Sequence, residues 1–184
     1  MHVPKQTIGP VRPIITEAIA AMRILEHPNP ALKQRAMEID PNADTELATL
    51  VAEMARAMYD APGVGLAASQ LGVLKRVIVY DVDEELVALC NPVITERSEE
   101  TEPDEEGCLS VPGIGVQIER NACITCEAVD LKGNPLTIEA EGLLARVIQH
   151  EIDHLDGVLI LDRCSAEERR DAIRRYNEVH EQAG

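Results

Sequence analysis

The sequence contains no phenylalanine or tryptophan and only three tyrosines among its 184 residues. Since 45% of the chain is nevertheless hydrophobic, Leu, Ile, Val, Ala and Met have to fill the core. No apolar run approaches the roughly 18 residues of a membrane-spanning helix, and residues 1–21 lack the basic segment and continuous apolar stretch of a signal peptide. We therefore expect a soluble, cytoplasmic protein that does not enter membranes.

Basic residues are scarce as well. Lys and Arg number 17 against 33 Asp and Glu, a net charge of −16, which argues against broad electrostatic binding to nucleic acid or anionic membranes. The exception is a cluster of four arginines in the last expected helix, namely Arg169, Arg170, Arg174 and Arg175. They are suited to contact ribosomal RNA, and the alternative is ion pairing with acidic residues of the same helix.

Five cysteines are an odd number in a chain without a secretion signal, so we expect no disulfide framework. Cys123 and Cys126 have the spacing of a zinc knuckle or a redox pair. In the strand expected there, residues three apart point to opposite faces, so these two sulfurs are not expected to share a metal.

Hydrophobic periodicity predicts both helices and strands along the chain. Residues 1–21 carry four Pro or Gly residues and are expected to form a flexible extension, followed by a single domain over 22–184.

Helices are expected over 43–60, 142–156 and about 165–182. In the last of these, Ser165 and Glu168 are expected to form a capping box. Strands are expected over 76–82, 86–90, 92–96, 116–118, 122–129 and 136–140, the first two as a hairpin. The acidic residues 96–106 are typical of a solvated loop.

The clearest motif is H-E-x-x-H at residues 150–154, inside the helix expected over 142–156. Residues four apart on an α-helix lie about 40° apart around its axis, so His150 and His154 project from one face. Glu151 lies beside that pair. This arrangement predicts two metal-binding imidazoles and a general base that acts on a metal-bound water.

A catalytic site of this kind needs a third protein ligand and one open position. Ile160 stands where metzincins place a third histidine, which excludes that class. In a gluzincin, a downstream acid such as Glu178 would be the third ligand. Cys108, preceded by a glycine, would complete a Cys-His-His set, although a buried free cysteine is the commoner role of this residue type. The residues alone leave these alternatives open.

Three segments together resemble peptide deformylase: residues 63–70 (GVGLAASQ), 106–110 (EGCLS) and 149–154 (QHEIDH). They occur in the family's order, and the similarity extends over roughly residues 22 to 165. The resemblance implies an α+β fold, in which antiparallel strands wrap around a central H-E-x-x-H helix, with an N-terminal helix and a C-terminal helix in addition. Two departures stand out. Ser69 replaces a common proline, and Gly115 replaces a substrate-contacting arginine, for which Arg120 is a candidate substitute.

The resemblance implies a hydrolase that removes the N-formyl group from the N-terminal formylmethionine of nascent polypeptides and releases formate. It assigns Cys108, His150 and His154 to one divalent metal, natively Fe²⁺, with Ni²⁺, Co²⁺ or Zn²⁺ as substitutes. Glu151 would be the general acid and base, while Gln70 and the backbone N–H of Leu109 would stabilise the oxyanion. A related metallo-deacylase or a zincin-type peptidase is the alternative.

A methionine side chain requires an apolar pocket near the metal. Leu143 and Val147 lie within about 60° of His150 on the helix, so we expect them to line the pocket with Val64 and Leu109. Gly65 and Glu106 complete the expected substrate-binding residues. Arg146 shares the helix face and is expected to pair with Glu106 at the rim.

Overall fold

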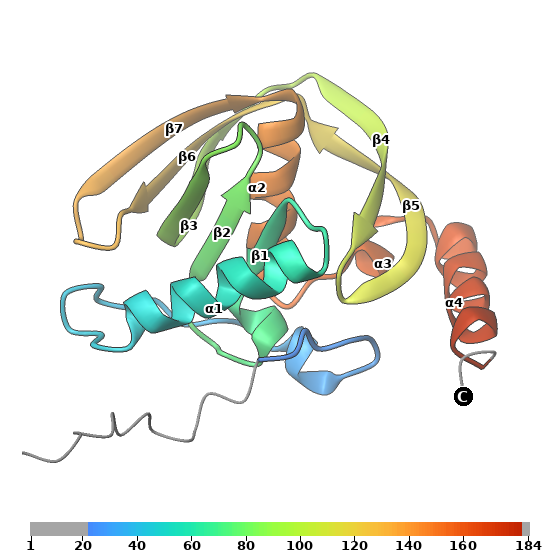
Figure 1. Cartoon of the computed structure of the whole chain (residues 1–184). Coiled ribbons are helices and arrows are strands. Elements are labelled where there is room, and N and C mark those ends of the chain that lie inside the picture. The colour runs from blue at the N-terminus through green and yellow to red at the C-terminus, as the bar shows by residue number, and fades with distance from the viewer. Residues whose placement is uncertain (1–21, 182–184) are drawn as a thin grey trace, which may run out of the picture.

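The computed structural model describes residues 22–181 (Figure 1), so the extension expected over residues 1–21 lies outside the described part of the chain. The fold is the expected α+β type. A five-stranded antiparallel sheet has the order β1-β2-β3-β6-β7, and a separate hairpin consists of β4 and β5. Within residues 22–181, none of the helices has the length and hydropathy needed to cross a membrane.

The larger sheet is formed by β1 (Gly65–Ala67), β2 (Val77–Asp81), β3 (Leu86–Arg97), β6 (Cys123–Val129) and β7 (Pro135–Glu141). β2 and β3 form the expected hairpin. The two strands expected over 86–90 and 92–96 are one strand, β3. Its pairing with β6 shifts register between Cys90 and Val93, and Asn91 there has a φ of 52°. The resulting irregularity accommodates Pro92, which has no N–H to give to the ladder.

The second sheet corrects the loop expected over residues 96–106. β4 (Thr101–Cys108) pairs along its length with β5 (Val111–Asn121). Residues 101–105 are exposed, whereas Glu106 and Cys108 turn inward. An acidic segment can form a strand here because β4 lies at an edge, where charged side chains remain hydrated and discourage pairing with other chains. Composition therefore predicted the exposure of this segment but not its backbone conformation.

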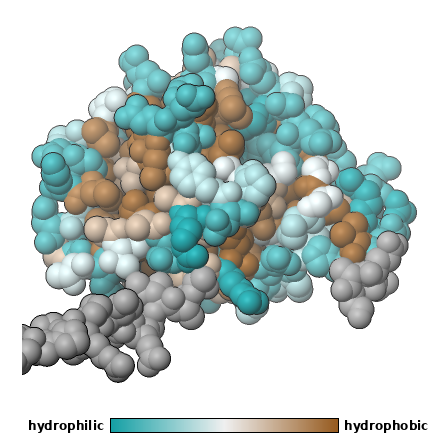
Figure 2. All heavy atoms as spheres, viewed as in Figure 1, coloured by the Kyte–Doolittle hydropathy of each residue, from teal (hydrophilic) through white to brown (hydrophobic). Residues whose placement is uncertain are grey.

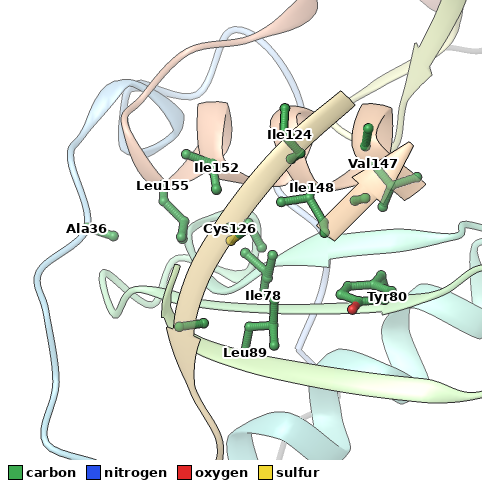
Figure 3. Packing of buried hydrophobic residues seen from close by; sticks show 14 residues of the cluster. Ala36, Ile78, Tyr80, Leu89, Ile124, Cys126, Val147, Ile148, Ile152 and Leu155 are labelled. Atoms are coloured by element: carbon green, nitrogen blue, oxygen red, sulfur yellow. The ribbon is translucent and has the colours of Figure 1, made fainter. Parts of the chain in front are cut away.

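Helix α2 (Gly142–Leu155) carries the H-E-x-x-H motif and lies between the large sheet and the β4–β5 hairpin (Figure 1). One face packs on the sheet (Figure 3), where Ile148, Ile152 and Leu155 meet Ile78, Leu89, Ile124 and Cys126. The helix ends before Gly157, which has a φ of 75° and leaves no space for a side chain beside the Lys33 carbonyl. A glycine at this position is the common helix stop that the sequence indicated.

Helix α1 (Leu47–Asp60) packs against β1 and β2 through a second cluster that includes Met54, Met58, Leu66 and Val79. It begins four residues later than the periodicity predicted. The carboxylates of Asp40 and Asp44 accept hydrogen bonds from the N–H groups of the second residue after each. These short-range bonds hold residues 40–46 in turns rather than in a helix.

The C-terminal helix α4 (Ala166–Glu181) follows the short helix α3 (Ile160–Arg163) and packs on β5 through Ala172 and Tyr176. Its predicted capping box is confirmed. The Glu168 N–H donates to Ser165 Oγ at 3.2 Å, and the Ser165 N–H donates to Glu168 Oε2 at 3.1 Å. Two 3-10 turns complete the fold, η1 (Pro30–Lys33) and η2 (Ala68–Leu71).

The two cysteines of the rejected zinc knuckle lie on opposite faces of β6. Cys126 is fully buried in the core and Cys123 is exposed. The alternation expected for a strand is therefore confirmed.

Candidate metal centre and active site

Three ligand-type side chains converge between α2 and the end of β4. Sγ of Cys108 and the ring nitrogens of His150 and His154 all lie within 4.8 Å of one another. Sγ is 3.3 Å from His154 Nε2, and the two histidine Nε2 atoms are 3.1 Å apart. Three atoms of this chemistry pointing at a common centre fit one first-row divalent ion with a further position left for water or substrate.

Glu106 orients one of these histidines. Its Oε2 lies 2.9 Å from His150 Nδ1, the nitrogen that points away from the cluster. The carboxylate also accepts bonds from Arg120 Nε and Nη2, each at 2.9 Å, and from Arg146 Nη1 at 2.8 Å. Burial alone would raise the pKa of Glu106, but the hydrogen bonds from Arg120 and His150 outweigh it and hold the pKa well below its usual range. An ionised carboxylate behind a ligand histidine fixes the ring and its tautomer.

The predicted Arg146–Glu106 ion pair is confirmed, whereas the substrate contact suggested for Arg120 is wrong. Arg120 is 6% exposed, and its Nη1 donates to Asp153 Oδ2 at 2.6 Å. It therefore links β5 to α2 inside the protein. A signal for this was present, because Val116, Ile118 and Arg120 alternate along one strand and share its buried face.

Glu151 is the unpartnered carboxylate of the site. It is 4% exposed, and its Oε2 is one of two buried side-chain polar atoms in residues 22–181 that lack a hydrogen-bond partner. The other is Nδ1 of His154. Burial lowers the pKa of His154 well below its usual value, which favours the neutral ring that binds metals. Burial raises the pKa of Glu151 to about 7. A buried carboxyl without a partner is costly and characteristic of a group that exchanges protons with a bound molecule.

Gly65 of β1 lies against this carboxylate. A side chain there would place its Cβ 2.5 Å from Glu151 Oε1 and 3.0 Å from Val147 Cγ1. The absence of a side chain at Gly65 therefore leaves the space that Glu151 occupies.

Gln70, in η2, is 1% exposed and borders the same cavity. Its Oε1 accepts the Ala67 N–H at 2.9 Å, and its Nε2 donates to Ser110 Oγ at 3.1 Å. Leu109, whose N–H was predicted as the second oxyanion donor, directly follows Cys108 and also borders the cavity. The structure thus brings both predicted donors to one site.

A cavity of about 1070 Å³ joins these groups. Its lining includes the predicted substrate-binding residues Val64, Gly65, Glu106, Leu143 and Val147. Val64 and Leu143 are largely exposed, whereas Val147 is buried. On the face shown in Figure 2, hydrophobic residues are visible between hydrophilic ones toward the middle of the molecule.

The wall of the cavity at Gly115 lacks the arginine that some related proteins carry at this position. Gly115 borders the cavity, and a Cβ built there would lie 2.7 Å from the carboxyl carbon of Glu105. The Glu105 side chain therefore occupies the space next to Gly115. A carboxylate lies where the family resemblance implied the guanidinium group of an arginine.

An antiparallel sheet that holds an H-E-x-x-H helix against a cysteine-bearing strand has the architecture of a metal-dependent hydrolase. Residues 21–170 match the family model described as polypeptide deformylase. The chain belongs to the peptide deformylase family, which confirms the resemblance read from its three motifs.

Individual relatives agree. The peptide deformylase of Pelotomaculum thermopropionicum is 48% identical over 146 residues, covering 79% of this chain and 93% of that protein. That of Rhizobium meliloti is 44% identical over 162 residues, covering 85% and 92%. The crystal structure of a peptide deformylase from Legionella pneumophila superposes with a TM-score of 0.81 at 39% identity, covering 87% of this chain and 95% of that one.

Proposed function

We propose that this protein hydrolyses the N-formyl group of N-terminal formylmethionine on nascent polypeptides and releases formate. The observation that carries the proposal is the convergence of Cys108, His150 and His154 beside the buried carboxylate of Glu151, at the wall of one cavity. Membership of the peptide deformylase family supports the same activity.

Cys108, His150 and His154 would hold one divalent ion, with Fe²⁺ as the native metal and Ni²⁺, Co²⁺ or Zn²⁺ as substitutes. One thiolate and two imidazoles suit several of these ions, and the Glu106 contact to His150 supplies the outer support that such ligands usually have. When bound, the ion would act as a Lewis acid toward water and toward the formyl carbonyl. Elemental analysis of protein purified without oxygen tests the choice of metal.

The chain's own residues account for the proton transfers. Glu151 takes a proton from the attacking water and later donates one to the leaving amine nitrogen. Its pKa of about 7 suits both directions near neutral pH. Gln70 Nε2 and the Leu109 N–H donate to the formyl oxygen as negative charge develops there. Both donors border the cavity that holds Glu151.

The methionine side chain would occupy the apolar part of the cavity, between Val64, Leu109, Leu143 and Val147. Gly65 allows a peptide backbone to approach β1 closely, because it has no side chain. The formyl group, the smallest acyl group, would then lie between Glu151 and the metal ligands, where an added methyl would be crowded.

The deciding experiment compares formyl-Met-Ala-Ser with acetyl-Met-Ala-Ser, using protein loaded with metal under anaerobic conditions. Formate release should be rapid, and acetate release should be nearly undetectable. Equal rates on both peptides would favour the alternative of a broader metallo-deacylase. Cleavage of an internal peptide bond would instead favour a zincin-type peptidase.

A cytoplasmic location and a ribosome contact through α4 stay predictions. Within α4 and its surroundings, Arg175 Nε lies 3.0 Å from Asp171 and Arg169 Nη1 lies 3.6 Å from Asp162. These ion pairs favour the alternative in which the arginines stabilise the protein itself. Co-sedimentation with ribosomes at low and high salt, comparing the parent with Arg170→Glu, would test the contact.

A further inference from the structure

Two buried serine hydroxyls hold Gln70 from different directions. Ser69 and Ser110 are 1% and 0% exposed, respectively. Ser69 precedes Gln70 in η2, and Ser110 lies in the turn between β4 and β5, directly after Leu109. Each hydroxyl makes a bond that links the Gln70 turn to another part of the site.

Ser110 acts on the side-chain amide. Gln70 Nε2 donates one of its two hydrogens to Ser110 Oγ at 3.1 Å, while Gln70 Oε1 accepts the Ala67 N–H at 2.9 Å. Rotating the amide by 180° would set Nε2 against that N–H, donor against donor. The pair of bonds therefore selects one orientation and leaves the second Nε2 hydrogen available in the cavity.

Ser69 acts on the turn that carries Gln70. Its hydroxyl donates to the carbonyl oxygen of His154 at 3.0 Å. This carbonyl belongs to the last turn of α2, where the usual bond from four residues further on is absent; it also accepts the Gly157 N–H at 3.1 Å. The same residue, His154, presents its imidazole to the candidate metal centre. One side-chain bond thus connects the oxyanion donor's turn directly to the backbone of a metal-ligand residue.

We propose that Ser69 and Ser110 are positioning residues, which fix the Gln70 amide relative to the metal ligands so that its free N–H meets the formyl oxygen. The inference rests on the proposed function, since it assigns Gln70 to the oxyanion. A donor helps only when it is held at hydrogen-bond distance from the place where charge develops.

The kinetic test uses Ser110→Ala, Ser69→Ala and Gln70→Ala, together with the two serine variants in the Gln70→Ala background. Ser110→Ala should lower kcat about 10-fold, less than the 10²- to 10³-fold typical of losing an oxyanion donor, with KM and metal content unchanged. Ser69→Ala should lower kcat to a smaller extent. In the Gln70→Ala background neither substitution should matter further, because the amide that they orient is gone. Equal losses in both backgrounds would overturn the proposal.

A second readout does not depend on turnover. The side-chain amide signals of Gln70, assigned by their loss in Gln70→Ala, should exchange with water faster in Ser110→Ala than in the parent protein. Ser165→Ala is the matched control, since it removes a bonded hydroxyl far along the chain at the cap of α4, and it should change neither the signals nor kcat. Unchanged Gln70 signals in Ser110→Ala would refute the positioning role of Ser110. A parent protein without formate release would refute the proposed function instead, and the amide measurement would still test the positioning role.

Discussion

Substitution of Arg120 by Met should destabilise the protein strongly. The arginine is buried and donates two hydrogen bonds to Glu106 and one to Asp153. Its removal leaves two buried carboxylates short of partners, although Arg146 and Arg163 still contact them. Removing one member of a buried ion pair costs about 3–5 kcal/mol. Since 1 kcal/mol shifts Tm by about 2–4 °C in proteins of this size, Tm should fall by about 6–20 °C.

Circular dichroism during heating measures this fall, with all samples at equal metal occupancy because bound metal itself raises Tm. Arg174→Met is the matched control. The Arg174 side chain is 69% exposed and pairs with Asp171 and Glu178 on the same helix, and exposed pairs contribute at most about 1 kcal/mol. A fall in Tm for Arg120→Met no larger than that of Arg174→Met would refute the stabilising role of the buried ion pairs.

Three further predictions concern the metal centre. Glu151→Gln should keep its metal and lose about 10²- to 10⁴-fold in turnover, measured as formate release and bound metal on the same preparation; metal loss would make Glu151 a ligand. Gly65→Ala should also keep its metal but lose up to about 10²-fold in turnover, because its Cβ displaces the carboxylate. Cys108→Ala should lose metal by elemental analysis while Cys123→Ala retains it, and the reverse would revive the zinc knuckle.

The histidines of the motif could be predicted from the sequence because their spacing is local. Helical periodicity alone puts His150 and His154 on one face, and the structure shows them there. Cys108 is different. It reaches the same place because the β4–β5 hairpin packs against α2, a contact between residues more than 40 positions apart, so periodicity left it open and the family resemblance supplied it.

Errors arose where a tertiary contact decides the role of a residue. The acidic segment before Cys108 was predicted as a loop, because its composition says nothing about pairing with β5. Arg120 was a candidate for substrate contact, because it lies near Gly115, where some related proteins carry a substrate-contacting arginine. Two buried carboxylates, one on β4 and one on α2, make its burial possible, and neither is its neighbour in sequence.

The two glutamates of the site show how such contacts divide chemical roles between identical side chains. Glu106 accepts hydrogen bonds from Arg120 and Arg146 and contacts His150, so its charge is stabilised and its pKa is low. Glu151 is equally buried but has an oxygen without a partner, and its pKa rises to about 7. A carboxylate that stays ionised can orient a ligand histidine but cannot exchange protons near neutral pH. Environments that push two pKa values apart therefore assign the orienting role to Glu106 and the proton transfer to Glu151.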